Sequence, residues 1–458
     1  MAFEEQDRDG IHLGMIRGEG LSTRGTFGAR EVVVDAVELN RIRPPYSARS
    51  FGVRVCCWIS VATTLFVAAV SPVSGSDAGV RPVPGAGSQG VSGTGPSGRA
   101  VVPAWGELIK TDIEVELPDE YAALDLESIG SPRWRFSDST PEKAGRILAD
   151  AGLTSSQVAE AMKSAISESP AGSPSTVSIA PDSSLVVSLS PEVRSRLYAA
   201  LATAGVNPYM SRPYVVGRGD AERWLKKSQL PEEIRALIRS LVYRRAGLDC
   251  FSDLELVFGR LQSRQDRMHL LKAVSRRPAV LAALRVSPGA DVDKLLGYWG
   301  RGIKTLDIRP VLEAVAAQEG GGTISLLHLL PRFAREHLFT FPTPPSVVGP
   351  APDCHWTTLN FFNNIPDNSI LTNGVSWNYI NERFYRVGEA SHYGDVLLFV
   401  SSRGKVVHSA RFIADDLVFT KNGNDFVQPW SMMRLPDVEG IYRLEGAERT
   451  LVYRAREN

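Results

Sequence analysis

A cysteine and a histidine in the last quarter of the chain have the chemistry of a thiol nucleophile and its base. Cys354 follows Asp353 at the start of a helix-like run, and His408 lies within a strand-like apolar run, Val406 to Ala414. Because Asp is a favourable N-cap residue, Asp353 predicts that Cys354 occupies the first helical turn. The helix dipole and the unpaired N–H groups stabilise a thiolate there, so we expect a thiol pKa below its usual value of about 8.5. His408 would accept the thiol proton and later protonate a leaving amine.

The whole pattern resembles the NlpC-type branch of the papain-like cysteine peptidases. The pattern is Asp-Cys at a helix start, Gly394-Asp395 before a strand and His408 on the next strand, within roughly residues 352–430. The resemblance implies a helix packed on a small antiparallel sheet and a Cys354–His408 dyad. It also implies an amidase or peptidase activity, with the peptide portion of a bacterial cell wall as the substrate.

A third polar residue should orient the imidazole of His408. The position that the family uses falls near Thr420, and Asn422 lies two residues further along. We choose Asn422, because an amide oxygen is a stronger and longer-reaching acceptor than a hydroxyl. A two-residue turn at Asp415-Asp416 would place Asn422 on the wrong face of the hairpin, whereas a longer turn or a bulge would correct that parity.

The sequence also departs from the family pattern. The residues after the cysteine are His355-Trp356 instead of a small pair, and no tyrosine stands just upstream of Cys354 to line an oxyanion site. These departures favour an alternative function, a catalytically inactive papain-like module that binds or scaffolds in the cell envelope. A third hypothesis is a helical interaction protein whose C-terminal sheet is unrelated to peptidases.

Composition gives no indication of a nucleic-acid partner. The chain has 458 residues, enough for two or three domains, and its 51 basic and 51 acidic side chains balance. An excess of Lys and Arg over residues 222–285 fits an anionic partner, but we favour the solvated face of a helical bundle. No cofactor motif is present, and His328 and His337 are too far apart in sequence to share a metal ion on one helical face.

The N-terminal part predicts export. An apolar run, residues 55–70, follows several arginines and is shorter than the roughly 20 residues of a membrane span. It fits the apolar region of a signal peptide, so we expect a periplasmic or cell-envelope protein, cleaved or anchored through this segment. The fifty residues before it are a long leader, which indicates either a start codon assigned too early or a short signal anchor.

Cysteine usage leaves one alternative open. Cys56 and Cys57 lie inside the apolar run, whereas Cys250 and Cys354 belong to the exported portion. In an oxidising compartment these two could form a disulfide. A nucleophilic Cys354 requires both thiols to be free.

The predicted fold class is α+β, with a helical middle region followed by a C-terminal papain-like domain. Within the middle regions we expect Leu185–Leu189 to form a strand and Ile324–Leu338 to form a helix. The predicted segments are an N-terminal extension (1–50), a signal peptide or anchor (51–75), a Gly/Ser/Pro linker (76–102), a mixed α/β region (103–190), a helical domain (191–341) and the papain-like domain (342–458).

Overall fold

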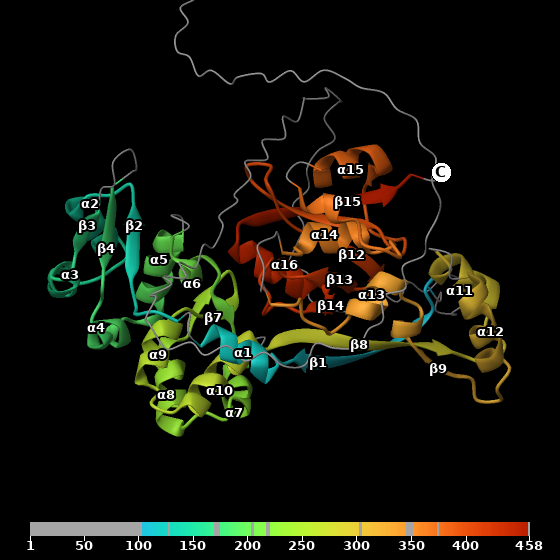
Figure 1. Ribbon diagram of the computed structural model, residues 1–458, viewed down its shortest axis with the longest axis horizontal. Coiled ribbons are helices and arrows are strands. Elements are labelled where there is room, and N and C mark those ends of the chain that lie inside the picture. The colour runs from blue at the N-terminus through green and yellow to red at the C-terminus, as the bar shows by residue number, and fades with distance from the viewer. Residues whose placement is uncertain are drawn as a thin grey trace, which may run out of the picture. The chain divides into compact units, whose positions relative to one another are not determined.

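The computed structural model describes residues 103–126, 129–168, 175–202, 206–216, 220–301, 305–344, 351–372 and 375–456 (Figure 1). The predicted extension, signal segment and linker lie outside the described residues. The chain divides into two compact units, Met1–Cys56 and Cys57–Asn458, and every described residue belongs to the second. This unit mixes helix and sheet, which confirms the α+β class.

The N-terminal lobe, residues 117–274, is built mainly from short helices around one hydrophobic core. Its helices are α1 (Asp119–Asp125), α2 (Pro141–Asp150), α3 (Ser155–Met162), α4 (Ser183–Ser188), α5 (Pro191–Ala202), α6 (Pro208–Ser211), α7 (Ala221–Lys227), α8 (Glu232–Leu241), α9 (Leu254–Arg260) and α10 (Arg264–Ser275). Two small antiparallel sheets complete it, in the orders β2-β4-β3 and β5-β7-β6. Their strands are β2 (Trp134–Ser137), β3 (Ile166–Glu168), β4 (Thr176–Ile179), β5 (Tyr214–Val215), β6 (Tyr243–Arg245) and β7 (Leu248–Phe251).

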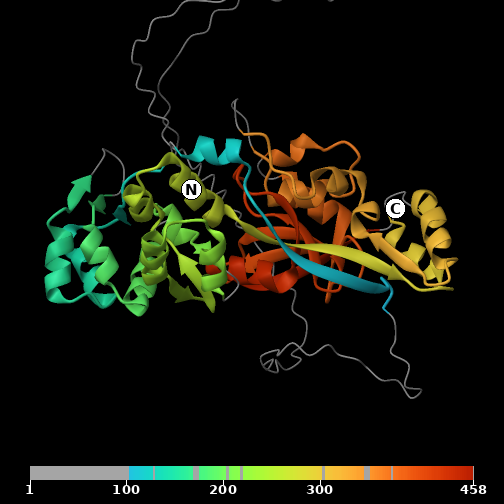
Figure 2. The same ribbon diagram turned by 90° about the horizontal axis from the view of Figure 1, so that it is seen from below.

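A long antiparallel pair is formed by β1 (Glu107–Val115) and β8 (Arg277–Val286) (Figure 2). The register sets Glu107 opposite Arg285, and β9 (Gly322–Ser325) pairs with the far end of β8. The helices that accompany this sheet are α11 (Val292–Trp299), α12 (Thr305–Ala316), the 3₁₀ turn η2 (Leu326–His328) and α13 (Arg332–His337).

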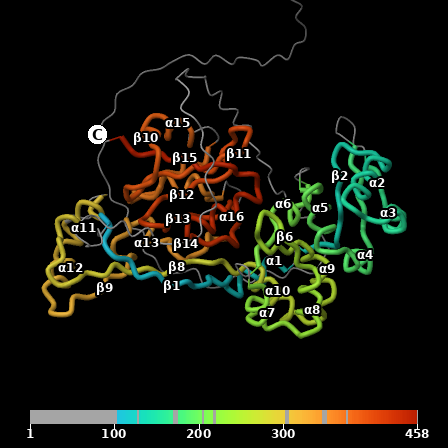
Figure 3. Tube along the Cα trace, turned by 180° about the vertical axis from the view of Figure 1, so that it is seen from behind, coloured from blue at the N-terminus to red at the C-terminus, as the bar shows by residue number. Residues whose placement is uncertain are grey.

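The C-terminal domain contains a six-stranded antiparallel sheet in the order β10-β15-β11-β12-β13-β14 (Figure 3). The strands are β10 (Phe384–Val387), β11 (Val396–Ser401), β12 (Val406–Ala414), β13 (Leu417–Lys421), β14 (Trp430–Arg434) and β15 (Ala447–Ala455). The helices are α14 (Cys354–Asn360), the 3₁₀ turn η3 (Asn368–Leu371), α15 (Val375–Arg383) and α16 (Leu435–Leu444).

The two faces of this sheet bury different helices, because successive side chains of a strand point to opposite faces. On one face Ile413 and Phe419 share a core with Leu359 of α14. On the other face Phe399 and Phe412 share a core with Tyr442 of α16. The helix that carries Cys354 and helix α16 therefore cover opposite faces of the strands that carry His408 and Thr420.

Several expected elements differ from the observed ones. Leu185–Leu189 is mostly helical, within α4, because Asp182 accepts a hydrogen bond from the backbone N–H of Ser184 and starts a helix there. Ile324–Leu338 is not one helix but the end of β9, η2 and α13. The predicted boundary at residue 190 does not separate two cores, since the core of the N-terminal lobe runs through both regions.

None of the described helices is long and apolar enough to cross a membrane.

Candidate functional site

Cys354 lies where the sequence predicts, at the first position of α14. Asp353 caps the helix, and its Oδ1 accepts a hydrogen bond of 2.8 Å from the backbone N–H of Trp356. The cap confirms the predicted helix start. The Cys354 side chain is buried, with 6% of its surface exposed.

Two residues of β12 fasten α14 to the sheet. The hydroxyl of Ser409 lies 2.9 Å from Nδ1 of His355 and donates to Oγ1 of Thr358 at 3.0 Å. The guanidinium of Arg411 donates to the carbonyl of Thr358 at 2.6 Å and to that of Gly394 at 2.5 Å. Burial lowers the pKa of Arg411 to about 9. The two carbonyl oxygens are the acceptors that satisfy this buried guanidinium. These contacts fix the position of α14, and with it Cys354, relative to β12.

The Gly394-Asp395 turn of the predicted pattern has a structural reason. Gly394 has a φ of +86°, and a Cβ at this position would collide with the ring of Phe362. The carboxylate of Asp395 accepts hydrogen bonds from the backbone N–H groups of Ser391 and His392 and pairs with Arg454 at 2.8 Å. The turn therefore sets the start of β11, the strand beside β12.

His408 is fully buried and points to the α16 face of the sheet. Its ring stacks on that of Tyr442, with centroids 3.7 Å apart and planes 10° apart. Its Nε2 lies 2.8 Å from Oγ1 of Thr420, while Nδ1 is buried without a hydrogen-bond partner among the described residues. One ring nitrogen is thus held, and the other is available for proton transfer.

The contact with Thr420 corrects our choice of Asn422 as the orienting residue. A bulge between Phe412 and Ala414 shifts the register so that Arg411 pairs with Phe419, which places both Thr420 and Asn422 on the same face as His408. No hydrogen bond joins Asn422 to the imidazole in the described structure. Its amide nitrogen lies 3.3 Å from the Met433 sulfur, and its oxygen accepts from the Tyr442 hydroxyl at 3.4 Å.

Cys354 and His408 are not joined to one another. The backbone N–H of Ser409, the residue after His408, lowers the pKa of the Cys354 thiol. No hydrogen bond between Cys354 and His408 is present in the described part of the chain. The imidazole and α14 lie on opposite sides of the strand, so the predicted dyad is not assembled in this conformation.

The expected thiolate is also absent at neutral pH in this conformation. Burial, and then the negative charge of Asp353, raise the pKa of Cys354 to about 12 and outweigh the Ser409 hydrogen bond. Burial, and then the charge of His355, hold the pKa of His408 well below its usual value. Our prediction of a depressed thiol pKa was wrong, because burial destabilises the thiolate at this helix start more than the helix dipole stabilises it. Both groups are neutral here.

Lys421 also belongs to this site, although the sequence pattern did not predict it as a site residue. The side chain is fully buried on the α14 face, and its Nζ donates to the carbonyls of Gly423 at 2.8 Å and Asp425 at 2.9 Å. Burial lowers the pKa of Lys421 to about 8, while the charges of Asp425, Cys354 and Asp353 act in the opposite direction. A lysine at the end of an apolar strand looks like a solvated strand terminus, so the sequence alone offered no indication of this burial.

Residues of the N-terminal lobe border the same region. Arg212, after α6, forms an ion pair of 3.3 Å with Glu445 at the end of α16, and Glu445 acts electrostatically on the Cys354 thiol. Val427 and Leu444 of the C-terminal domain belong to the core of the N-terminal lobe. These contacts contribute to the burial of the site.

The two described cysteines are both free and buried. The alternative of a Cys250–Cys354 disulfide is therefore excluded in this structure. Burial raises the pKa of Cys250 to about 12, so this thiol is a matched buried reference for Cys354.

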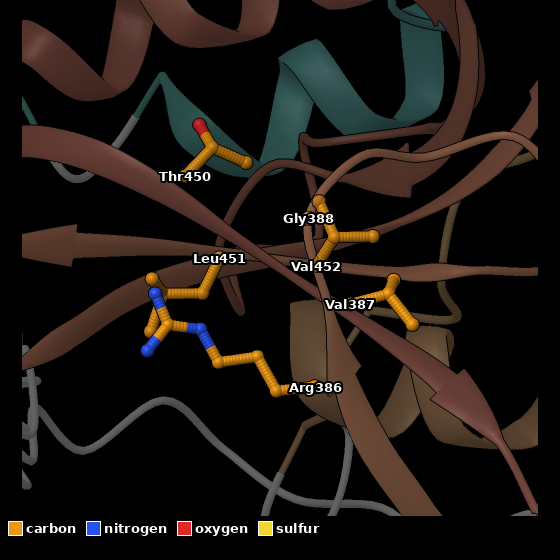
Figure 4. Close-up of a pocket in the computed structure, with 6 residues that line it drawn as sticks. All are labelled: Arg386, Val387, Gly388, Thr450, Leu451 and Val452. Atoms are coloured by element: carbon orange, nitrogen blue, oxygen red, sulfur yellow. The ribbon is translucent and has the colours of Figure 1, made fainter. Parts of the chain in front are cut away.

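An open groove lies elsewhere on the C-terminal domain. It has a volume of about 350 Å³ and is lined by Arg386, Val387, Gly388, Thr450, Leu451 and Val452, from β10, β15 and the residue after β10 (Figure 4). Its lining includes none of the predicted catalytic residues. No group of three or more His, Cys, Asp or Glu side chains suited to a metal ion occurs within the part of the chain that the structure describes.

The chain has no match among family models, curated proteins or solved structures. The function proposed below therefore rests on the residues of this chain.

Proposed function

We propose that the protein is an exported cysteine hydrolase, an amidase or peptidase, in which Cys354 is the nucleophile and His408 its base. The observation that carries the proposal is the arrangement of the His408 ring. Thr420 lies within hydrogen-bond distance of Nε2, whereas Nδ1 has no partner among the described residues, and the N–H of the neighbouring Ser409 lowers the pKa of the Cys354 thiol. A general base needs one ring nitrogen fixed by a hydrogen bond and the other free to accept a proton.

The resting state would be a neutral pair. Because burial raises the pKa of Cys354 and lowers that of His408, the thiol proton would move to Nδ1 as the sulfur attacks a carbonyl carbon. The acyl group would then be bonded to sulfur, and the imidazolium would protonate the leaving amine. A water molecule would release the acid and regenerate the thiol. This sequence requires His408 and Cys354 to come within hydrogen-bond distance when substrate binds.

Cell-wall peptides are the proposed substrate class, and a papain-like domain in the cell envelope is the proposed setting. Both come from the resemblance of residues 352–430 to NlpC-type peptidases. The experiment is hydrolysis of a muropeptide mixture by the purified chain, with released amines and carboxylates followed by mass spectrometry. Cys354→Ala should abolish turnover, and Cys250→Ala should retain it. Retained turnover in folded Cys354→Ala would refute the assignment.

A catalytically inactive binding or scaffolding module is the second candidate. The observation that favours it is the burial of the site: a protonated thiol, a neutral imidazole on the other side of β12, and no hydrogen bond between them in the described structure. An inactive module would bind cell-wall peptides with the same affinity in wild type and in Cys354→Ala, and neither protein would turn them over.

A further inference from the structure

Lys421 is a buried cation that the proposed mechanism does not use. Lysine is rarely buried without a paired charge or several acceptors. Here two of its three N–H groups donate to the carbonyls of Gly423 and Asp425. The third N–H has no acceptor among the residues described. The ammonium lies 6.0 Å from the ring centre of Trp430, which closes its other side.

The strand register brings Lys421 to Cys354. Arg411 pairs with Phe419, so continuing β12 and β13 by two residues sets Ser409 opposite Lys421. Side chains opposite one another in antiparallel strands have their Cβ atoms about 5 Å apart. Ser409 contacts α14 through its side chain, and its backbone N–H lowers the pKa of the Cys354 thiol. Lys421 therefore lies on the α14 face, beside the thiol, whereas His408 lies on the other face.

We propose that Lys421 is a positioning residue for Cys354, whose ammonium stabilises the thiolate and fixes the loop after β13. The proposal rests on the assignment of Cys354 as the nucleophile. His408 accepts the thiol proton, and Lys421 keeps its own proton and offers the third N–H to the sulfur anion. The other ionisable groups that act on this pair are Asp353 at the N-cap of α14, Asp425 from the loop, and Glu445 and Tyr442 from the end of α16. The imidazoles of His355 and His408 act on one another. Among those acting directly on the thiol, Lys421 is the cation.

Lys421 thus has two proposed functions, one structural and one electrostatic. The hydrogen bonds to Gly423 and Asp425 tie the loop to the sheet, and the charge acts on the sulfur. A role in packing alone would survive in Lys421→Met, because methionine fills much of the same space without a charge. A charge role would survive in Lys421→Arg and be lost in Lys421→Met. This difference separates the two roles experimentally.

The test is the pH dependence of Cys354 alkylation by iodoacetamide, measured on the full chain between pH 6 and pH 10 by peptide-resolved mass spectrometry. Lys421→Met should slow alkylation at pH 8 by about tenfold, which corresponds to one pKa unit, and Lys421→Arg should stay within about threefold of wild type. Lys163→Met, which removes an exposed charge in the N-terminal lobe, should leave the profile unchanged. An unchanged profile in Lys421→Met, or equal slowing in Lys421→Arg, would overturn the proposal.

A reciprocal measurement keeps the proposal testable when Lys421→Met does not fold. The titration of the Lys421 ¹³Cε signal is compared between wild type and Cys354→Asp, both of which retain the lysine. A midpoint at least half a unit higher in Cys354→Asp supports the pairing, because a carboxylate beside the ammonium stands in for the thiolate and favours the protonated lysine. Identical midpoints would refute it. Neither measurement uses a substrate, so failure of the proposed hydrolase activity, seen as absent turnover, is a separate result.

Discussion

Thr420→Val should be the most informative single change in the site. The substitution keeps the shape of the side chain and removes the hydroxyl that lies 2.8 Å from Nε2 of His408. Since Nδ1 already has no partner among the described residues, the buried imidazole would lose its remaining hydrogen bond. Leaving a buried polar group unsatisfied costs about 1–3 kcal/mol. We expect the free energy of unfolding to fall by that amount.

Urea unfolding followed by tryptophan fluorescence measures this loss, with an unchanged m-value as the check that only stability changed. Thr420→Ser is the matched control, because it keeps the hydroxyl and loses one methyl group, worth about 0.8 kcal/mol. If Thr420 orients the base, turnover should fall at least tenfold in Thr420→Val and recover in Thr420→Ser. Asn422→Ala should leave turnover near wild type.

The opposite pattern would refute this reasoning. Loss of turnover in Asn422→Ala with full activity in Thr420→Val would restore the amide as the orienting group. Equal loss in Thr420→Val and Thr420→Ser would show that the hydroxyl is not what matters at this position.

Four further outcomes follow from the structure. Asp353→Ala removes the cap of α14 and should lower the free energy of unfolding, measured with urea, by about 1 kcal/mol. An unchanged free energy would mean that the cap does not stabilise the helix. Arg212→Ala leaves Glu445, which raises the pKa of the Cys354 thiol, without its cation and should slow Cys354 alkylation several-fold, whereas faster labelling of both Cys354 and Cys250 would indicate unfolding. Both thiols should be free in a non-reducing digest of native protein, and a linked peptide pair would contradict this. Burial raises the pKa of Asp253 to about 6, so the folded state binds its proton more tightly than the unfolded chain, whose pKa is about 3.9. Stability from this group should be complete below pH 4 and lost as the pH rises through 6, and a pH-stability curve that is the same in Asp253→Asn would disprove it.

Local sequence rules predicted the parts of the site that depend on neighbouring residues. Asp353 caps α14, and β12 carries His408, because capping and strand patterns are read over a few residues. The helix after Ser190 begins by the same local rule, with the Ser190 hydroxyl accepting from the N–H of Val193.

The parts that depend on tertiary packing were not predictable in the same way. The bulge near Phe412, which has no signal in the sequence, puts both Thr420 and Asn422 on the face of His408, and the choice between them turned on the packing of Asn422 against Met433 and Tyr442. The thiol pKa turned on burial by segments far along the chain, so the local dipole argument gave the wrong sign. Lys421 was missed because its acceptors, the carbonyls of Gly423 and Asp425, are main-chain groups that any residues would supply.

The most direct test of the central claim is covalent capture of the nucleophile by a peptide carrying a thiol-reactive vinyl sulfone. The full chain would be treated at pH 7.5, and the modified residue identified by peptide mapping. We expect modification at Cys354, with Cys250 untouched, and at least tenfold slower modification in folded His408→Ala. Modification of Cys354 at the same rate in His408→Ala, or none at Cys354 in the wild type, would contradict it.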